Sequence, residues 1–385
     1  MRKTLYIAAA LLMVLPACKK SVPAPSVEKG MTFEASTAPT KSHFGETGLA
    51  LYWDEYDDMA VYSITATSSD PVAGATSGLA YIRDGFDTQT AHFQSARTES
   101  EWFNGAADGE SRRFVAYYPA YGQPMEFDEV TVDDNTVDVL PVYVNDSQNG
   151  LADFGRYHFM LSRANNYTKG QSVILRDFEP LTSLLKFKLM PDSAMQNAGF
   201  DYKIERISIQ AYFYGKVHVN SPEEEDTYWW EYEYAPDSWR QVDNIVGFRY
   251  ITVDNLLDTA SPVKLQKFLS NEVTYSSNGR YLSLLRDLTL DLKHDQPTQD
   301  LYAVVFPTEE YPFRGNIALW ISARYDAYNG NEYLHGISHE GYVTIPSPGF
   351  EAGKRYDFIV TLSPDEMYLQ NDPNAPDWGY EVINW

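Results

Sequence analysis

The amino-acid sequence predicts an all-β protein with two β-sandwich domains in tandem. Short segments in which apolar and polar residues alternate recur along the chain, and turn-forming residues separate them. Aromatic residues, which favour strands, make up 15% of the 385 residues. The best helical candidate, residues 255–269, contains Pro262, so no long amphipathic helix is predicted. Many short strands joined by turns are typical of a sandwich.

The chain begins with the pattern of a lipoprotein signal. A basic pair, Arg2-Lys3, precedes an apolar stretch that ends at Leu15, and Leu-Pro-Ala-Cys follows in the form of a lipobox. We expect a signal peptide over residues 1–17 and a lipid on Cys18, which is the only cysteine. The alternative is an ordinary signal peptide that happens to end near a cysteine. Residues 18–30 contain two prolines and are expected to form the lipidated tether.

The N-terminal sandwich is expected over residues 31–170. Its predicted strands are residues 31–36, 49–53, 59–64, 113–118, 130–132 and 137–144. Pro119 ends the fourth of these segments. Residues 145–157, rich in Asn, Asp and Gly, lead toward a domain boundary that we expect near residue 170.

The C-terminal sandwich is expected over residues 171–385. Its predicted strands are residues 172–180, 184–189, 204–213, 301–307, 317–323 and 355–362. The last of them has the clearest alternation, because Tyr356, Phe358, Val360 and Leu362 would all lie on one face.

Composition and motifs argue against several classes of function. A formal net charge of -24 makes nucleic acid an unfavourable partner. The sequence contains no dinucleotide fingerprint, P-loop, nucleophile elbow or zinc-protease motif, so we expect no cofactor and no enzyme activity, and a secreted hydrolase is disfavoured. His335 and His339 would lie about 13 Å apart on a strand, too far to share a metal ion. Residues 145–150 resemble the start of a calcium loop, but Arg156 stands where its last carboxylate is needed.

An aromatic run within an acidic segment is the best candidate for an adhesive surface. Trp and Tyr offer large flat faces with polar tips, which suit a sugar or a protein partner. The alternative is a β-hairpin whose tryptophan fills the core. The residues of this candidate surface are Tyr228, Trp229, Trp230 and Tyr232.

Several motifs, taken in order, resemble the fimbrillin family, the type V pilins of anaerobic Gram-negative bacteria. After the lipoprotein signal they are Thr40-Lys41 before Trp53 and Asp57-Asp-Met-Ala-Val-Tyr62, Phe114-Val-Ala-Tyr-Tyr-Pro119, Phe178-Glu-Pro-Leu-Thr-Ser-Leu-Leu-Lys-Phe-Lys-Leu189, Tyr302-Ala-Val-Val-Phe-Pro307 and Phe350-Glu-Ala-Gly-Lys-Arg-Tyr-Asp-Phe-Ile-Val-Thr-Leu362. The third motif matches in part, since many relatives carry a histidine near Thr182.

The resemblance implies two transthyretin-like, Greek-key sandwiches in a subunit that assembles into surface fimbriae by donor-strand exchange. Its partners would be other fimbrial subunits, the outer membrane through lipid on Cys18, and a host or glycan ligand. In such stalk subunits a protease cuts after a basic residue and removes an N-terminal strand. The candidate cut sites are Lys41 and Lys29, and a cut after Lys41 would release residues 31–36. Lys41 can equally flank a turn that is never cut, as in anchor subunits that keep their lipid.

The end of the chain is a candidate donor strand. Residues 377–385 follow a polar link with two prolines. On a strand, Tyr380 and Val382 would point to one face, and Ile383 and Trp385 to the other. The alternative is a last edge strand packed on its own domain. The leading hypothesis is therefore a fimbrial subunit of the cell outer membrane that serves in adhesion, and the alternative is a lipid-anchored surface protein that binds glycans.

Overall fold

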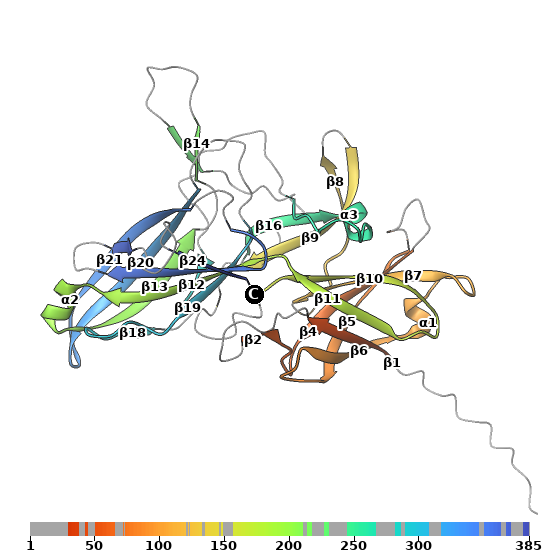
Figure 1. Ribbon diagram of the computed structural model, residues 1–385, viewed down its shortest axis with the longest axis horizontal. Helices are drawn as coiled ribbons and strands as arrows, with labels where there is room; N and C mark the ends of the chain where they lie inside the picture. Colours follow the sequence, from red (N-terminus) through yellow and green to blue (C-terminus); the bar gives the residue numbers. More distant parts are fainter. Residues whose placement is uncertain are drawn as a thin grey trace, which may run out of the picture.

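A computed structural model confirms the prediction of an all-β protein. The structure describes residues 30–37, 43–44, 51–65, 72, 74–120, 122, 124–132, 135–145, 148, 157–210, 214–217, 227–230, 245–266, 282–285, 289–307, 317–345, 350–362, 367–370 and 380–384. Strands dominate this part of the chain, and the helices within it are short (Figure 1). None of these helices is long and apolar enough to cross a membrane.

Seven strands of the N-terminal half close into a barrel, where a two-sheet sandwich was expected. The barrel order is β1-β11-β10-β7-β4-β5-β6. Their bounds are β1 Gly30–Thr37, β4 Asp58–Thr65, β5 Thr76–Asp84, β6 Thr90–Thr98, β7 Ser111–Tyr118, β10 Met160–Thr168 and β11 Val173–Pro180. A small sheet of β2 (His43–Phe44) and β3 (Leu51–Tyr52) lies between β1 and β4 in the sequence. The barrel closes because β1 pairs with β6 on one side and with β11 on the other.

Aromatic side chains fill the barrel. Phe33, Trp53, Phe93 and Phe114 have no exposed surface and belong to one hydrophobic cluster. Helix α1 (Glu99–Trp102) adds the fully buried Trp102 to this cluster. A Thr98–Glu101 capping box fixes the start of that helix, because each partner satisfies a backbone N–H of the other. The cluster therefore holds strands together that are far apart in the sequence.

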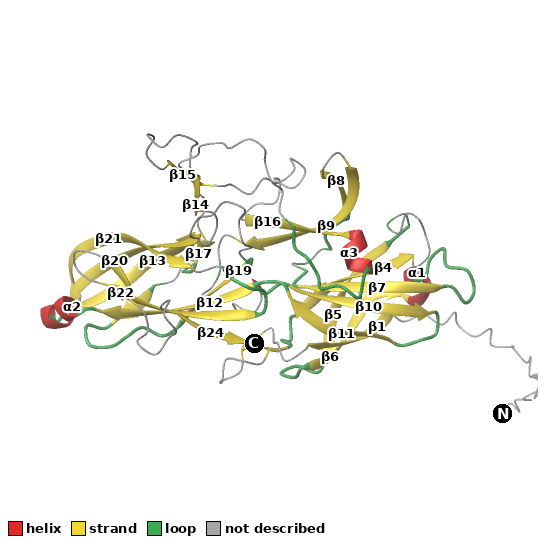
Figure 2. Cartoon of the chain, turned by 45° about the horizontal axis from the view of Figure 1, so that its top comes forward, coloured by secondary structure: helices red, strands yellow, loops and turns green. Residues whose placement is uncertain are grey.

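The C-terminal half contains two five-stranded sheets. The first has β12 (Ser183–Pro191), β19 (Leu301–Val305), β22 (Lys354–Leu362), β23 (Met367–Gln370) and β24 (Tyr380–Asn384). The second has β13 (Asp201–Gln210), β17 (Leu282–Ser283), β18 (Leu290–Leu292), β20 (Ile317–Asn329) and β21 (Glu332–Ile345). Buried residues of both sheets, such as Phe187, Phe358 and Ile204, share one hydrophobic cluster, and the sheets form two layers (Figure 2). Helix α2 (Ser193–Ala198) and the hairpin of β14 (Tyr214–Val217) and β15 (Thr227–Trp230) complete this half.

A third sheet covers the outside of the barrel. It has the order β16-β9-β8 and consists of β8 (Asp128–Val132), β9 (Asn135–Asn145) and β16 (Ile245–Thr252). Its buried residues Leu140 and Ile251 belong to the same hydrophobic cluster as Tyr62 and Tyr117 of the barrel strands. Because β16 and the helix α3 (Val253–Leu257) come from the second half of the sequence, the chain returns to the barrel after it has left it (Figure 1).

The expected division near residue 170 stays a prediction, and the strand topology shows where the chain changes sheet in this region. Strand β11, which opens the predicted second domain, is a barrel strand, and the change of sheet falls between Pro180 and Ser183. In the helical candidate over residues 255–269, the described residues are helical only up to Leu257, where α3 ends. After α3 the chain runs without helix to Gln266, which pairs with Tyr250.

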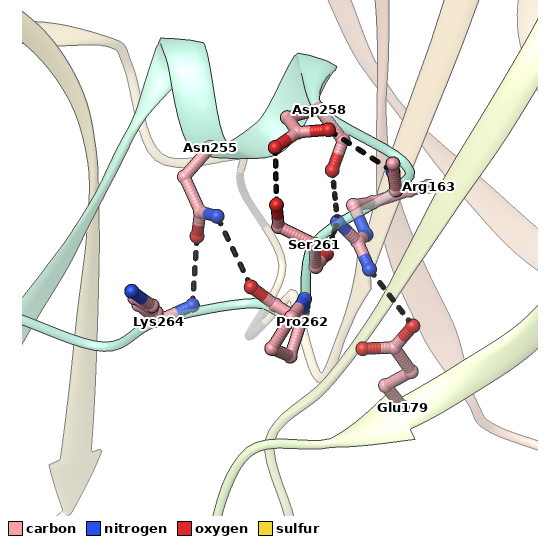
Figure 3. A network of polar contacts seen from close by, with 8 residues as sticks. Arg163, Glu179, Asn255, Asp258, Ser261, Pro262 and Lys264 are labelled. Carbon is pink, nitrogen blue, oxygen red and sulfur yellow. Dashed lines mark hydrogen bonds and ion pairs between the residues drawn. The ribbon is translucent and has the colours of Figure 1, made fainter.

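Two arginines of the barrel, Arg163 and Arg113, hold the end of α3, and Figure 3 shows the contacts of Arg163. Arg163 donates from Nη1 to the carbonyl oxygens of Asp258 and Ser261, both at 2.6 Å, and from Nη2 to the Glu179 carboxylate at 3.1 Å. Arg113 donates to the carbonyl oxygen of Leu257 at 2.7 Å. A cation is favourable at this point, because the last carbonyl groups of a helix carry partial negative charge. The arginines therefore tie the returning segment to β7 and β10.

We expect Arg163→Met to lower the free energy of unfolding by about 2–3 kcal/mol, because the Arg163 side chain, which is 8% exposed, loses two hydrogen bonds to carbonyl oxygens and its ion pair with Glu179. Arg83→Met, at an exposed position of β5, is the matched control and should change stability by less than about 0.5 kcal/mol. Urea unfolding of both variants measures the difference. Equal losses would contradict a specific role for the Arg163 contacts.

Candidate functional site

The candidate functional site is strand β1 together with the two strands that it joins, β6 and β11. It is the first described strand, and it runs antiparallel to β6 and parallel to β11. Phe33 lies opposite Phe93 on one side and Val173 on the other, and Ala35 lies between Ala91 and Leu175. Without β1 the barrel would open along two strand edges, each with backbone groups that need a new partner.

The inward face of β1 fits a slot of defined shape. Met31 is 8% exposed, and Phe33 and Ala35 are fully buried, whereas Thr32 between them is exposed. The Phe33 ring makes an edge contact with Trp102 at a centroid distance of 5.6 Å and a tilted contact with Phe114 at 5.9 Å. We call this space between β6 and β11 the β1 slot. It takes a large aromatic side chain and, two residues later, a small one.

Trp53 closes the barrel interior near the end of β1. Its ring makes edge contacts with Phe93, Tyr118 and Phe178 at centroid distances of 5.0, 5.4 and 5.5 Å. The neighbouring Asp57 is buried, and its carboxylate accepts hydrogen bonds from the Tyr118 hydroxyl at 2.8 Å and from the Asp54 N–H at 2.6 Å. The acidic pairs after Trp53 thus include one structural carboxylate, which the sequence pattern does not distinguish from its neighbours.

Gly30 starts β1 in close contact with β6. The register between the two strands shifts between Gly30 and Thr32, and a Cβ atom at Gly30 would lie 1.9 Å from the Ser95 carbonyl oxygen. We expect Gly30→Ala to push the start of β1 away from β6 and to cost about 1–3 kcal/mol. Faster hydrogen exchange of the β1 amides would reveal this displacement of the strand. The control is Thr32→Val, at an exposed position of the same strand. Equal exchange rates in the two variants would contradict the expectation.

The structure describes only some of the residues singled out by the sequence. Cys18, Lys29, Lys41, Tyr232 and Trp385 lie outside the described residues. The other members of the candidate adhesive surface, Tyr228, Trp229 and Trp230, lie in β15, opposite Lys216, Gly215 and Tyr214 of β14.

The candidate donor strand lies in a sheet of its own half. Tyr380, Val382 and Ile383 belong to β24, which pairs antiparallel with β22 and places Tyr380 opposite Phe358. β12 covers one edge of β22, and β23 and β24 share the other edge end to end. β24 is therefore an edge strand with one described neighbour.

The two histidines predicted to lie apart are both on β21, where His335 pairs with Ala327 and His339 with Ala323. Within the described parts of the chain, no group of three His, Cys, Asp or Glu side chains is placed to hold a metal ion.

Comparison with known proteins gives structural neighbours only. No family model and no curated protein sequence matches the chain. A candidate cell adhesion protein from Bacteroides ovatus is 12% identical, with a TM-score of 0.43 over 93% of this chain and 98% of the other. The tip fimbrial protein Mfa3 from Porphyromonas gingivalis, with a C-terminal truncation, is 9% identical, with a TM-score of 0.33 over 92% and 99%. A fimbrial assembly protein from Parabacteroides distasonis is 9% identical, with a TM-score of 0.31 over 93% and 100%. Two of these structures are thus named as fimbrial proteins and one as a candidate cell adhesion protein.

Proposed function

We propose that this protein is a fimbrial subunit of a Gram-negative outer membrane, that it assembles by donor-strand exchange, and that it serves in cell adhesion. The observation that carries the proposal is the position of β1, an N-terminal strand that closes the barrel between β6 and β11. A barrel that loses one strand exposes two edges and an apolar slot, and a strand from another subunit can satisfy both. Lipid on Cys18 would hold the uncut precursor at the membrane.

Of the two candidate cut sites, Lys41 is the one that would open the slot. A cut after Lys29 leaves β1, which starts at Gly30, covalently joined to the rest of the barrel. A cut after Lys41 separates β1, which ends at Thr37, from everything that follows. The same cut frees the remaining chain from the lipid on Cys18. Release from the membrane and opening of the slot would then be one event.

The C-terminal strand repeats the pattern of the strand it would replace. β1 contains Phe33-Glu34-Ala35, and β24 contains Tyr380-Glu381-Val382. In a strand that takes the place of β1, Tyr380 would enter the position of Phe33, and Val382 that of Ala35. The incoming strand belongs to a second copy or a related subunit, and β24 must first leave the edge of β22.

Limited trypsin treatment of the purified protein tests this function. We expect a cut after Lys41, followed by polymers whose length increases with protein concentration, as measured by light scattering and electron microscopy. Lys41→Ala should keep β1 joined to the barrel and stay monomeric, even where trypsin cuts after Lys29. A chain that ends before Asp377 should be cut after Lys41 but stay monomeric. Cut wild-type protein that remains monomeric at high concentration would contradict assembly by strand exchange.

The β14–β15 hairpin supports a second candidate function, glycan binding at the cell surface. It carries Tyr228, Trp229 and Trp230 on a hairpin that stands out from the two sheets (Figures 1 and 2). Aromatic rings on such a hairpin suit stacking against sugars. Binding of the uncut monomer to a glycan array, lost when Trp229 and Trp230 are both replaced with alanine, would favour this function.

A further inference from the structure

The hairpin of β10 and β11 is open at the end nearest its turn. Among the described residues, the ladder between the two strands joins Met160 with Pro180 and Leu161 with Glu179, and no further pair. The pairing of β10 with β7 shifts between Arg163 and Asn166, so β10 changes its course there. The first residues of β11 therefore lack backbone ladder bonds to β10.

The Tyr167 side chain fills this opening. Its hydroxyl donates a hydrogen bond to the Ile174 carbonyl oxygen at 2.8 Å and accepts one from the Ile174 N–H at 3.3 Å. The ring packs against Phe114 of the barrel cluster, with centroids 6.0 Å apart. A single phenol thus takes the place that a neighbouring strand would occupy beside Ile174.

The opposite edge of the same segment belongs to β1. Val173, Ile174 and Leu175 pair in sequence with Phe33, Glu34 and Ala35. This start of β11 is thus held by a complete strand on one side and by one hydroxyl group on the other. When β1 leaves, Tyr167 supplies the hydrogen bonds that remain on the β10 side.

We propose that Tyr167 is a positioning residue that keeps β11 extended after β1 has left, and so sets how fast the open slot accepts a new strand. The inference rests on the proposed function. In the intact protein β1 imposes the strand conformation, so this segment stays extended even without the Tyr167 hydroxyl. In the open barrel, loss of the hydroxyl lets the segment lose order, and the incoming strand must then restore that order as it binds.

The test uses protein cut after Lys41 and separated from the released fragment in mild urea. The probe is a fluorescent peptide with the sequence of residues 30–37, which is the strand β1 that occupies the slot in the intact protein. We expect Tyr167→Phe to slow peptide uptake roughly tenfold or more, since a disordered acceptor edge must be ordered during binding. Tyr81→Phe is the control, because Tyr81 is 51% exposed on β5. Hydrogen exchange at Ile174 should be faster in Tyr167→Phe than in wild type in both states, because its N–H loses its acceptor, and the factor should be larger after the cut, when β1 no longer holds the strand.

The outcomes separate the two proposals. If cut wild-type protein takes up no peptide, the proposed strand exchange fails, and the role of Tyr167 fails with it. If wild type and Tyr167→Phe take up peptide at the same rate, the positioning role is overturned while strand exchange stands. If Tyr167→Phe speeds Ile174 exchange as much in the intact protein as in the cut one, Tyr167 is merely structural, and the inference is likewise overturned.

Discussion

Replacing Phe33 with alanine is expected to lower the free energy of unfolding by about 3–5 kcal/mol, the usual range for a buried phenylalanine. Phe33 is fully buried, and its ring contacts both Trp102 and Phe114. The close packing of this cluster leaves little room for the barrel to collapse around the missing ring. Denaturant unfolding of the intact protein, followed by tryptophan fluorescence, measures the loss.

The same substitution separates a structural from an exchangeable role for β1. In protein cut after Lys41, the Phe33→Ala fragment should leave the β1 slot faster than the wild-type fragment, because its main apolar anchor is gone. Thr32→Val, on the exposed face of the same strand, should leave both stability and release unchanged. If Phe33→Ala and Thr32→Val behaved alike, the apolar slot would not be what holds β1.

The strands were largely predictable from local pattern, and their neighbours were not. The alternation of Met31, Phe33 and Ala35 predicts a strand with one buried face, and the structure has β1 at this position. Alternation does not reveal which strand lies alongside. Partners such as Val173 of β11 are more than a hundred residues away, and their selection depends on the packing of the whole cluster. Closure into a barrel was missed for this reason.

The residues around the β1 slot were also not predictable from local pattern, because they come together from separate strands. Trp53 belongs to a sequence motif, but its place among Phe93, Tyr118 and Phe178 depends on three separate strands. The role of Tyr167 cannot be predicted from the residues around it, because its hydroxyl donates a hydrogen bond to Ile174 of β11, beyond the next turn. The helical candidate over residues 255–269 has a local signal in Pro262, and the helix α3 ends at Leu257, before this proline.

Acid is expected to destabilise the junction between the two halves through His158. This side chain precedes β10 and is fully buried, and its Nδ1 lies 2.5 Å from the hydroxyl of Thr182, between β11 and β12. The backbone carbonyl oxygen of Thr182 accepts a hydrogen bond from the Gly353 N–H at 2.9 Å, next to β22. A charge placed on His158 would therefore disturb the point where the chain passes from the barrel to the first five-stranded sheet.

Burial lowers the pKa of His158 from 6.5 to about 3, because the charged imidazolium loses its hydration. The unfolded chain, with a pKa near 6.5, then binds more protons than the folded protein between these two values. The contribution of the neutral His158 side chain to the free energy of unfolding is thus fully present above pH 6.5, and it is lost as the pH falls toward 3. At about 1.4 kcal/mol for each pH unit, the loss at pH 4.5 should be roughly 2–3 kcal/mol.

Carboxyl groups also titrate in acid, so the effect must be measured as a difference between proteins. Urea unfolding from pH 7.5 to 4.5 should give a steep loss of stability in wild type and a shallower one in His158→Gln, whose neutral amide keeps a hydrogen-bonding group near Thr182 but cannot take up a proton. His92→Gln, at an exposed position of β6, should keep the wild-type slope. Parallel curves for wild type and His158→Gln would show that the junction tolerates the charge, and that acid unfolds the protein elsewhere.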